Sequence, residues 1–179
     1  FVGQIIERKG IFDLLRAIKI LKKKGIRVIL LIAGEGQRRP VLMRYIQKNN
    51  LESEVNFLGI VNYHILPEVY SIADIFVLPS YEEIWGLVVN EAMACGLPVI
   101  VSDRVGAGED LIKPGENGFV FPVGNTKILA QYMEKILKDP VLAKRMGKRS
   151  QEIIKPFNNA NRAKVFLEAI KFSLTNKNA

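Results

Sequence analysis

The chain has 179 residues, of which 49% are hydrophobic, and a formal net charge of +8 from 26 Lys and Arg against 18 Asp and Glu. This length and apolar content suffice for one hydrophobic core. A single cysteine and a single histidine exclude a disulfide framework and a metal site built from Cys or His clusters. No apolar run approaches the ~20 residues of a membrane span. We therefore expect a cytoplasmic protein, and no metal.

The positive charge favours anionic partners: nucleotides, phosphosugars, nucleic acid or an acidic membrane face. A solvated basic surface is the alternative, and composition leaves both open. The basic residues are scattered and do not alternate with aromatic residues, so we expect no nucleic-acid partner.

Short apolar runs alternate with helical patterns as far as residue 122. Strands are predicted at residues 1–6, 27–36, 54–59, 74–80, 97–103 and 118–122. Helices between them are predicted at residues 10–24, around 42–46, at 65–72 and from about 87 to 96. This alternation predicts an α/β fold with a doubly wound parallel sheet.

Three further helices are predicted after the last strand: one capped by Asn125, one from about 140 to 154, and one over about 159–174. We expect one domain over residues 1–179, with an α/β core over about 1–155 and a C-terminal helix over about 156–179. The chain begins at Phe1 and enters an apolar segment directly, so we expect a fragment of a longer protein.

Glu83 and Glu91 stand on either side of a Trp-Gly-Leu turn. On one helix they would lie roughly 80° and ~12 Å apart, too far for a catalytic acid-base pair. The helix is instead expected to begin near Leu87, so that free N–H groups at Gly86, Leu87 and Val88 form an anion site between the two acids. A sugar at one Glu and a ribose at the other would describe a nucleotide-sugar site. The alternative to a ligand site is that Glu91 only stabilises the start of the helix and that Glu83 is a solvated loop residue.

The segment EIWGLVVNEAMACGLPV, residues 83–99, resembles the signature of retaining glycosyltransferases of the GT-B fold. These belong to the large, glycosyltransferase family 4-like group that includes sucrose and glycogen synthases and bacterial mannosyltransferases. The resemblance extends in order through FVGQIIERKG, LLIAGEG, VNFLG, YSIADIFVLPS and GENGFVFPVGN. It covers the C-terminal, donor-binding half of such an enzyme, a Rossmann-like domain.

The resemblance implies that Glu83 contacts the hydroxyls of the donor sugar and Glu91 the ribose. It assigns the main-chain N–H groups of residues 86–88 to the diphosphate, and Lys9 to the charge on the leaving diphosphate. Gln4 stands where the family often has Arg, which makes Arg8 the candidate for the second positive charge.

Gly34 and Gly36 would let the backbone approach the nucleoside, and Gly59 and Ile60 would lie near the base. For these four residues, turns that follow strands are a sufficient alternative explanation. Cys95 and the exposed His64 are expected to have no role in the site.

By the same resemblance, the substrate is a nucleoside-diphosphate sugar, with no cofactor and no metal. The partner is an N-terminal acceptor-binding domain of the same enzyme, without which we expect weak nucleotide binding and no sugar transfer. The C-terminal helix is expected to pack toward that domain, and contact with the inner membrane face is expected only through the full-length enzyme. Two alternatives remain: an epimerase-like or phosphorylase-like enzyme on a similar scaffold, or a non-catalytic nucleotide-binding or interaction module.

Overall fold

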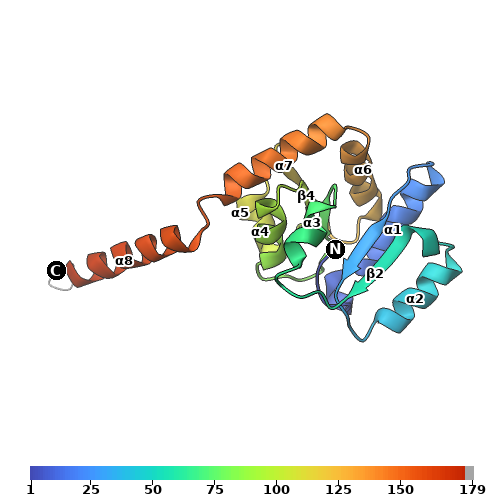
Figure 1. The fold of residues 1–179 in the computed structure, drawn as a ribbon, viewed down its shortest axis with the longest axis horizontal. Helices are drawn as coiled ribbons and strands as arrows, with labels where there is room; N and C mark the ends of the chain where they lie inside the picture. The colour runs from blue at the N-terminus through green and yellow to red at the C-terminus, as the bar shows by residue number, and fades with distance from the viewer. Residues whose placement is uncertain (176–179) are drawn as a thin grey trace.

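The computed structural model describes residues 1–175, except for the side chains of residues 159, 160 and 162. Strands alternate with helices, and helices complete the chain (Figure 1). The strands are β1 (Leu30–Ala33), β2 (Val55–Gly59), β3 (Phe76–Leu78), β4 (Val99–Ser102) and β5 (Gly118–Phe121). The helices are α1 (Ile11–Lys23), α2 (Arg39–Lys48), α3 (Leu66–Ser71), α4 (Leu87–Ala94), α5 (Gly106–Leu111), α6 (Thr126–Leu137), α7 (Pro140–Ile154) and α8 (Asn159–Thr175). Two 3-10 turns, η1 (Glu7–Lys9) and η2 (Glu52–Glu54), precede α1 and β2.

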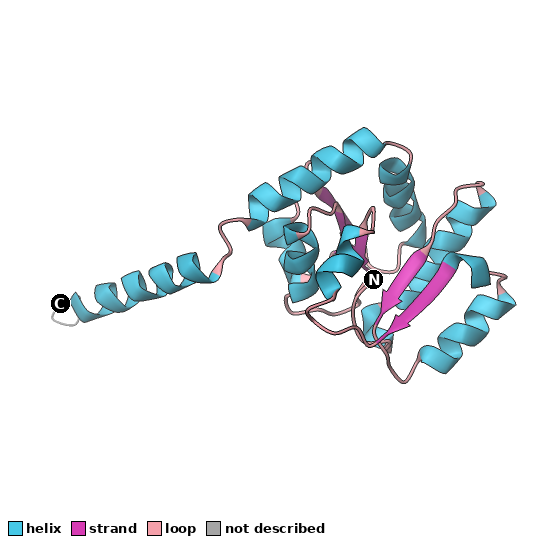
Figure 2. Cartoon of the chain, viewed as in Figure 1, coloured by secondary structure: helices cyan, strands magenta, loops and turns pink. Residues whose placement is uncertain are grey.

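All the strand pairs are parallel, which confirms the predicted α/β fold. The strands form two sheets, one with the order β1-β2 and one with the order β3-β4-β5, seen as separate magenta groups in Figure 2. Each residue of β3 and β4 is buried, as expected for parallel strands covered on both faces. Around them, α1 packs on α6 and α4 packs on α7.

The strand predicted for residues 1–6 is largely absent. Only Val2 pairs with β1, in an isolated parallel bridge to Ala33, and residues 7–9 form η1 instead. Backbone hydrogen bonds still run along this segment, from the Gly3 N–H to the Ala33 carbonyl and from the Ile5 N–H to the Glu35 carbonyl, each at 2.9 Å. Gly34, between these two acceptors, has a φ of +144°. A φ in this range favours glycine.

Side-chain caps set the boundaries of the two helices that follow the sheet. Asn125 Oδ1 accepts a hydrogen bond from the Ile128 N–H at 3.1 Å, which confirms the predicted cap of α6. Asp139 Oδ1 accepts from the Leu142 N–H at 2.9 Å, and Pro140 takes the first position of α7. Pro is favoured there because the first helical N–H has no intrahelical acceptor.

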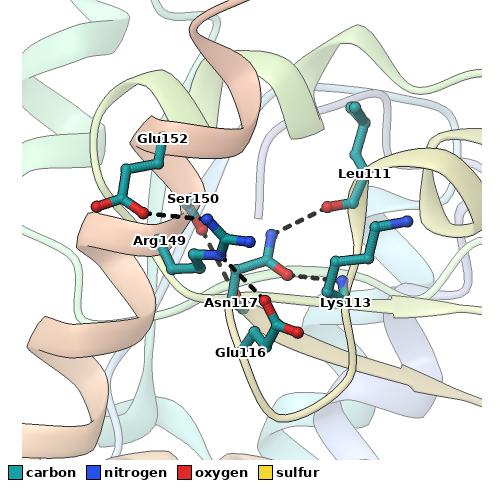
Figure 3. A network of polar contacts seen from close by, with 7 residues as sticks. All are labelled: Leu111, Lys113, Glu116, Asn117, Arg149, Ser150 and Glu152. Atoms are coloured by element: carbon teal, nitrogen blue, oxygen red, sulfur yellow. Dashed lines mark hydrogen bonds and ion pairs between the residues drawn. The ribbon is translucent and has the colours of Figure 1, made fainter.

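The buried side chain of Asn117 fixes the turn that leads into β5 (Figure 3). Its Oδ1 accepts from the Lys113 N–H at 2.7 Å, and its amide donates to the Leu111 carbonyl at 3.0 Å. Ser150 of α7 donates to the Leu97 carbonyl at 2.7 Å, just before β4. The Ser150 bond ties α7 to the residues just before β4. The two Asn117 bonds explain the Asn in this turn as structural.

The helix predicted over 159–174 is confirmed as α8, while the last residues of the predicted segment 156–179 lie outside the described part of the chain. In Figure 1, α8 extends away from the other elements. Its large apolar side chains are exposed, namely Val165, Phe166, Leu167, Ile170, Phe172 and Leu174. Within residues 1–175, no helix is long and apolar enough to cross a bilayer.

Candidate functional site

Two loops meet at the carboxyl ends of the strands. One runs from Gly3 to Gly10, and the other follows β3 from Pro79 to Gly86. Gly10 has a φ of +65°, and a Cβ at this position would overlap the Pro79 carbonyl. The two loops therefore touch through their backbones, and only glycine fits between them.

Lys9 and Glu83 form an ion pair across this contact, Nζ to Oε2. Their side chains are mostly buried, with 12% and 15% of their surfaces exposed. The backbone of Glu83 is held from the other side, because its N–H donates to the Arg104 carbonyl at 3.0 Å and its carbonyl accepts from the Gly106 N–H at 3.0 Å. The two residues predicted to act on the donor sugar and the diphosphate are thus brought into direct contact.

Arg8 lies beside this pair but is exposed. Its Nη1 donates to the Glu82 carbonyl at 3.2 Å, and its own carbonyl accepts from the Tyr81 N–H at 2.7 Å. Arg8 therefore joins the same two loops and brings a second positive charge near Glu83.

The helix α4 begins where the sequence predicts. Gly86 is its N-cap with a φ of +92°, and no side chain caps the helix. The N–H groups of Leu87 and Val88 occupy the first positions, which have no intrahelical acceptor. Leu87 is 62% exposed, so this end of α4 is open to solvent. A helix start with free N–H groups, the kind of place that suits an anion, therefore lies next to the Lys9–Glu83 pair.

Glu91, the acid on α4, is held by Tyr70, which is not among the predicted site residues. The buried Tyr70 of α3 donates its hydroxyl to Glu91 Oε2 at 2.9 Å. Burial, and then the charge of Glu91, raise the pKa of the Tyr70 phenol. Burial and Glu91 also raise the pKa of the Cys95 thiol. Tyr70 lies in the quoted segment YSIADIFVLPS, but no spacing in the sequence indicates its partner.

A second unforeseen contact ties the loop after β3 to α1. The Tyr81 hydroxyl donates to Asp13 Oδ2 at 2.8 Å, and Arg16 Nη1 donates to Asp13 Oδ1 at 2.5 Å. Asp13 is 1% exposed, so both oxygens need these donors. A carboxylate in the buried stripe of a helix is a signal that could have indicated such a partner.

Three of the five remaining predicted residues line a pocket of about 330 Å³. Its lining includes Gln4, Gly34 and Ile60, together with Val2, Gly3, Ala33, Glu35, Val61 and Leu66. Ile60 is 83% exposed at its edge. One turn after Leu66, Tyr70 lies on the same face of α3, so this helix links the pocket to Glu91.

Gly34 lines this pocket, and Gly36 and Gly59 are chain neighbours of the lining residues Glu35 and Ile60. A Cβ on Gly34 would overlap the Gly3 carbonyl, and one on Gly36 would overlap the backbone of Ile5. Gly59, at a φ of +67°, accepts a hydrogen bond from the Gly34 N–H at 2.7 Å. Gly34 directly follows β1 and Gly59 ends β2, so a turn after a strand, the alternative stated above, accounts for both of these glycines.

Trp85 packs against the core and donates its indole N–H to Asn90 Oδ1 at 2.9 Å. His64 is exposed, as predicted. Within the described residues, no three His, Cys, Asp or Glu side chains lie together in a group suited to a metal ion.

The sequence profile described as "Glycosyl transferases group 1" matches residues 1–153. The chain belongs to this family. The resemblance to GT-B glycosyltransferases is thereby confirmed, and the group 1 domain described here has the Rossmann-like α/β fold of their C-terminal domain.

Three similar proteins illustrate the match of this glycosyltransferase domain. An alpha-D-kanosaminyltransferase from Streptomyces kanamyceticus is 32% identical over 150 residues, covering 84% of this chain and 39% of that protein. The sucrose-phosphate synthase of Thermosynechococcus elongatus superposes with a TM-score of 0.81 at 31% identity, covering 97% of this chain and 45% of that one. Anabaena Alr3699/HepE, solved in complex with UDP, superposes with a TM-score of 0.83 at 25% identity, covering 95% and 48%. The chain thus spans less than half the length of these relatives.

Proposed function

We propose that this chain is the donor-binding domain of a retaining glycosyltransferase, which moves a sugar from a nucleoside diphosphate to an acceptor hydroxyl. The observation that carries the proposal is the Lys9–Glu83 pair beside the open N-terminus of α4. Carboxyl ends of parallel strands are where such sheets bind ligands. The UDP complex of the similar Anabaena protein supports a nucleoside diphosphate as the ligand class.

In this proposal the diphosphate lies on the main-chain N–H groups at the start of α4, at residues 86–88. Lys9 faces the leaving diphosphate, and its positive charge stabilises the negative charge that develops as the glycosidic bond breaks. Arg8 adds a second positive charge where Gln4 replaces the arginine usual in the family. Neither step requires a metal ion.

Glu83 accepts hydrogen bonds from the hydroxyls of the donor sugar. Since Lys9 occupies Glu83 Oε2 in the structure, both groups exchange part of this ion pair for contacts with sugar and phosphate. Glu91 accepts from the ribose hydroxyls through its outer oxygen while Tyr70 holds Oε2. The nucleoside then extends toward the pocket lined by Gln4, Gly34 and Ile60, with Gly36 and Gly59 next to its lining residues in the chain.

The acceptor site belongs to an N-terminal domain of the longer protein in this proposal. The chain spans 39% of the kanosaminyltransferase it resembles, which leaves room for such a domain. The exposed apolar side chains of α8 are proposed to pack toward it. The isolated chain is accordingly expected to bind nucleotide weakly and to transfer no sugar.

Calorimetric titration of the isolated chain with UDP, GDP and ADP tests the donor site. One nucleotide should bind, and Lys9→Ala and Glu91→Ala should each weaken its binding about tenfold, since a charged hydrogen bond contributes roughly 1.5–3 kcal/mol. Glu82→Ala is the matched control, because the Glu82 side chain is exposed on the same loop. If no nucleotide binds at millimolar concentration and Glu91→Ala has no effect, the donor-site proposal is wrong.

A further inference from the structure

Glu91 is held by a neutral side chain. The Tyr70 hydroxyl donates to Glu91 Oε2 at 2.9 Å and joins α3 to α4, which lie side by side (Figure 1). Among the described side chains, no ion pair includes Glu91. Glu83, by contrast, is paired with the Lys9 ammonium group. The two acids of the candidate site are therefore fixed by donors of different charge.

The other carboxylate oxygen of Glu91 is open to a ligand. In the part of the chain that the structure describes, Glu91 Oε1 accepts no hydrogen bond, and the one unpartnered side-chain polar atom that is fully buried is Ser80 Oγ. Glu91 Oε1 is therefore reached by solvent. Because an ionised carboxylate only accepts hydrogen bonds, a ligand group that replaces this solvent must be a donor, such as a hydroxyl.

Tyr70 has little freedom to move. It is 3% exposed, and its ring packs edge-on against Phe76 of β3, with 5.8 Å between the ring centroids and 68° between the ring planes. Burial, and then the charge of Glu91, raise the pKa of the phenol, so the hydroxyl keeps its proton at neutral pH. Because side chains in a packed core hold one rotamer, the hydroxyl is a donor at a fixed place.

We propose that Tyr70 is a positioning residue that sets the orientation of Glu91, and thereby the preference of the site for ribose over 2′-deoxyribose. This rests on the proposed function, in which Glu91 accepts hydrogen bonds from the ribose. A Glu side chain samples several rotamers on a helix surface, and ordering it during binding lowers affinity. The bond from Tyr70 orders the carboxylate before the nucleotide arrives, and Oε1 is left to accept from the 2′-hydroxyl.

The neutrality of Tyr70 matters for the strength of that contact. A Lys or Arg in its place would compensate the charge of Glu91, whereas a phenol holds one oxygen and leaves the carboxylate charged. Hydrogen bonds to a charged acceptor are stronger than those to a neutral one. The ribose hydroxyl would thus meet an acceptor that is both oriented and charged.

The position of α3 agrees with this role. Leu66, one turn before Tyr70, lines the pocket of about 330 Å³ toward which the nucleoside is proposed to extend. A single short helix therefore contacts both the proposed nucleoside pocket and Glu91. The bond from Tyr70 lies where a ribose between that pocket and the start of α4 would pass.

Calorimetry of the full-length protein with ribonucleotides and deoxyribonucleotides tests the proposal. UDP, GDP and ADP are compared with dUDP, dGDP and dADP, which each lack one hydroxyl. In the parent, the nucleotide that binds should bind about tenfold more tightly than its 2′-deoxy form, as expected for a hydrogen bond to a charged group. In Tyr70→Phe, which keeps the ring, this ratio should fall to about threefold or less.

Two further variants serve as references. Tyr45→Phe is the matched control, because the Tyr45 ring packs edge-on against Phe12 in the same way, at 5.6 Å between centroids, but its hydroxyl does not bond to Glu91. It should keep the ratio of the parent. Glu91→Ala removes the acceptor and should bring the ratio to about one.

A ratio in Tyr70→Phe equal to that of the parent, even with both affinities lowered, would show a purely structural role for Tyr70 and overturn the proposal, while the proposed function would stand. A parent that binds both forms equally would overturn the proposal together with the ribose contact of Glu91, and a parent that binds no nucleotide would overturn the donor site as well.

If Tyr70→Phe does not fold, 4-methylphenylalanine and 4-aminophenylalanine in place of Tyr70 are compared. Both fill the volume of the hydroxyl, but only the amine donates a hydrogen bond. A preference for the ribonucleotide that is larger with the amine supports the proposal, and equal preferences contradict it.

Discussion

Tyr81 and Asp13 are joined by a 2.8 Å hydrogen bond, although 68 positions separate them in the chain. Tyr81 lies on the loop that carries Glu83, and Asp13 lies in the first turn of α1, which follows Lys9. Asp13 is buried and Tyr81 is partly exposed. The bond therefore connects the loop that carries Glu83 to the helix that follows Lys9.

Removing this hydroxyl should destabilise the protein. Tyr81→Phe leaves Asp13 Oδ2 without its donor, and a buried acceptor without a partner costs about 1–3 kcal/mol. Tm in thermal denaturation should fall by several degrees. Tyr63→Phe, at a tyrosine that is 68% exposed, should leave Tm within about 1 °C. Equal shifts in the two variants would show that the Asp13 contact contributes nothing.

Gly10→Ala should be more destabilising than Gly25→Ala. Both glycines have positive φ, +65° and +73°, so both substitutions incur the left-handed strain of roughly 1–2 kcal/mol. Only at Gly10 does the added Cβ meet backbone, at Pro79, while nothing lies within 4 Å of a Cβ at Gly25. Urea denaturation should give a free energy of unfolding lower for Gly10→Ala by about 2 kcal/mol or more. Similar free energies of unfolding in the two variants would mean that the two loops can move apart without loss of stability.

The Tyr70–Glu91 contact should make stability depend on pH in the alkaline range. The pKa of Tyr70 is raised above its ordinary value of 10.0, by burial first and then by Glu91. Below pH 10 the phenol is neutral in both states, so the hydrogen bond contributes fully. Above pH 10 the unfolded chain loses the proton more readily, and the free energy of unfolding falls as pH rises.

Urea denaturation at pH 8 and pH 11 measures this effect. The fall in unfolding free energy should be smaller in Tyr70→Phe than in the parent chain, because the substituted chain has no phenol to ionise at that position. An identical fall in Tyr70→Phe and the parent would contradict the raised pKa.

In the full-length enzyme, Glu83→Ala should reduce turnover far more than nucleotide affinity. A carboxylate that contacts only the sugar does not hold the nucleoside diphosphate, whereas a contact that strengthens in the transition state accelerates the reaction. We expect kcat to fall about 100-fold or more and nucleotide Kd to change less than about threefold. Steady-state kinetics and calorimetry, with Glu82→Ala as control, measure the two quantities. Equal losses in both would contradict the sugar-contact role.

The isolated chain should self-associate through α8. Phe166 and Phe172 are 71% and 69% exposed on this helix, and exposed apolar patches of this kind promote association. The double variant Phe166→Ser with Phe172→Ser should lower the dimer fraction in sedimentation velocity at high protein concentration. Lys164→Ser with Lys171→Ser on the same helix should not lower it. A dimer fraction that is unchanged by the two Phe substitutions would exclude α8 as the contact.

Local signals in the sequence identified the elements and most of the candidate site. Gly86 marks the start of α4, and Asn125 and Asp139 mark the starts of α6 and α7, because capping and turn chemistry depend on neighbouring residues. The prediction failed at residues 1–6, where an apolar run forms only one bridge. A strand forms only where a neighbouring strand is available to pair with it, and the β-propensity of a segment does not show whether one is.

The sequence by itself determined the α/β class, the family and the position of each acid, Glu83 on a loop and Glu91 on a helix. Only the tertiary structure decided which side chains meet: Lys9 with Glu83, 74 positions away, and Tyr70 with Glu91, 21 positions away. It also showed that the parallel strands divide into two sheets, β1-β2 and β3-β4-β5. The physical reason is that helices and caps depend on residues close in sequence, whereas these contacts form only when parallel strands pair and bring distant loops to one edge.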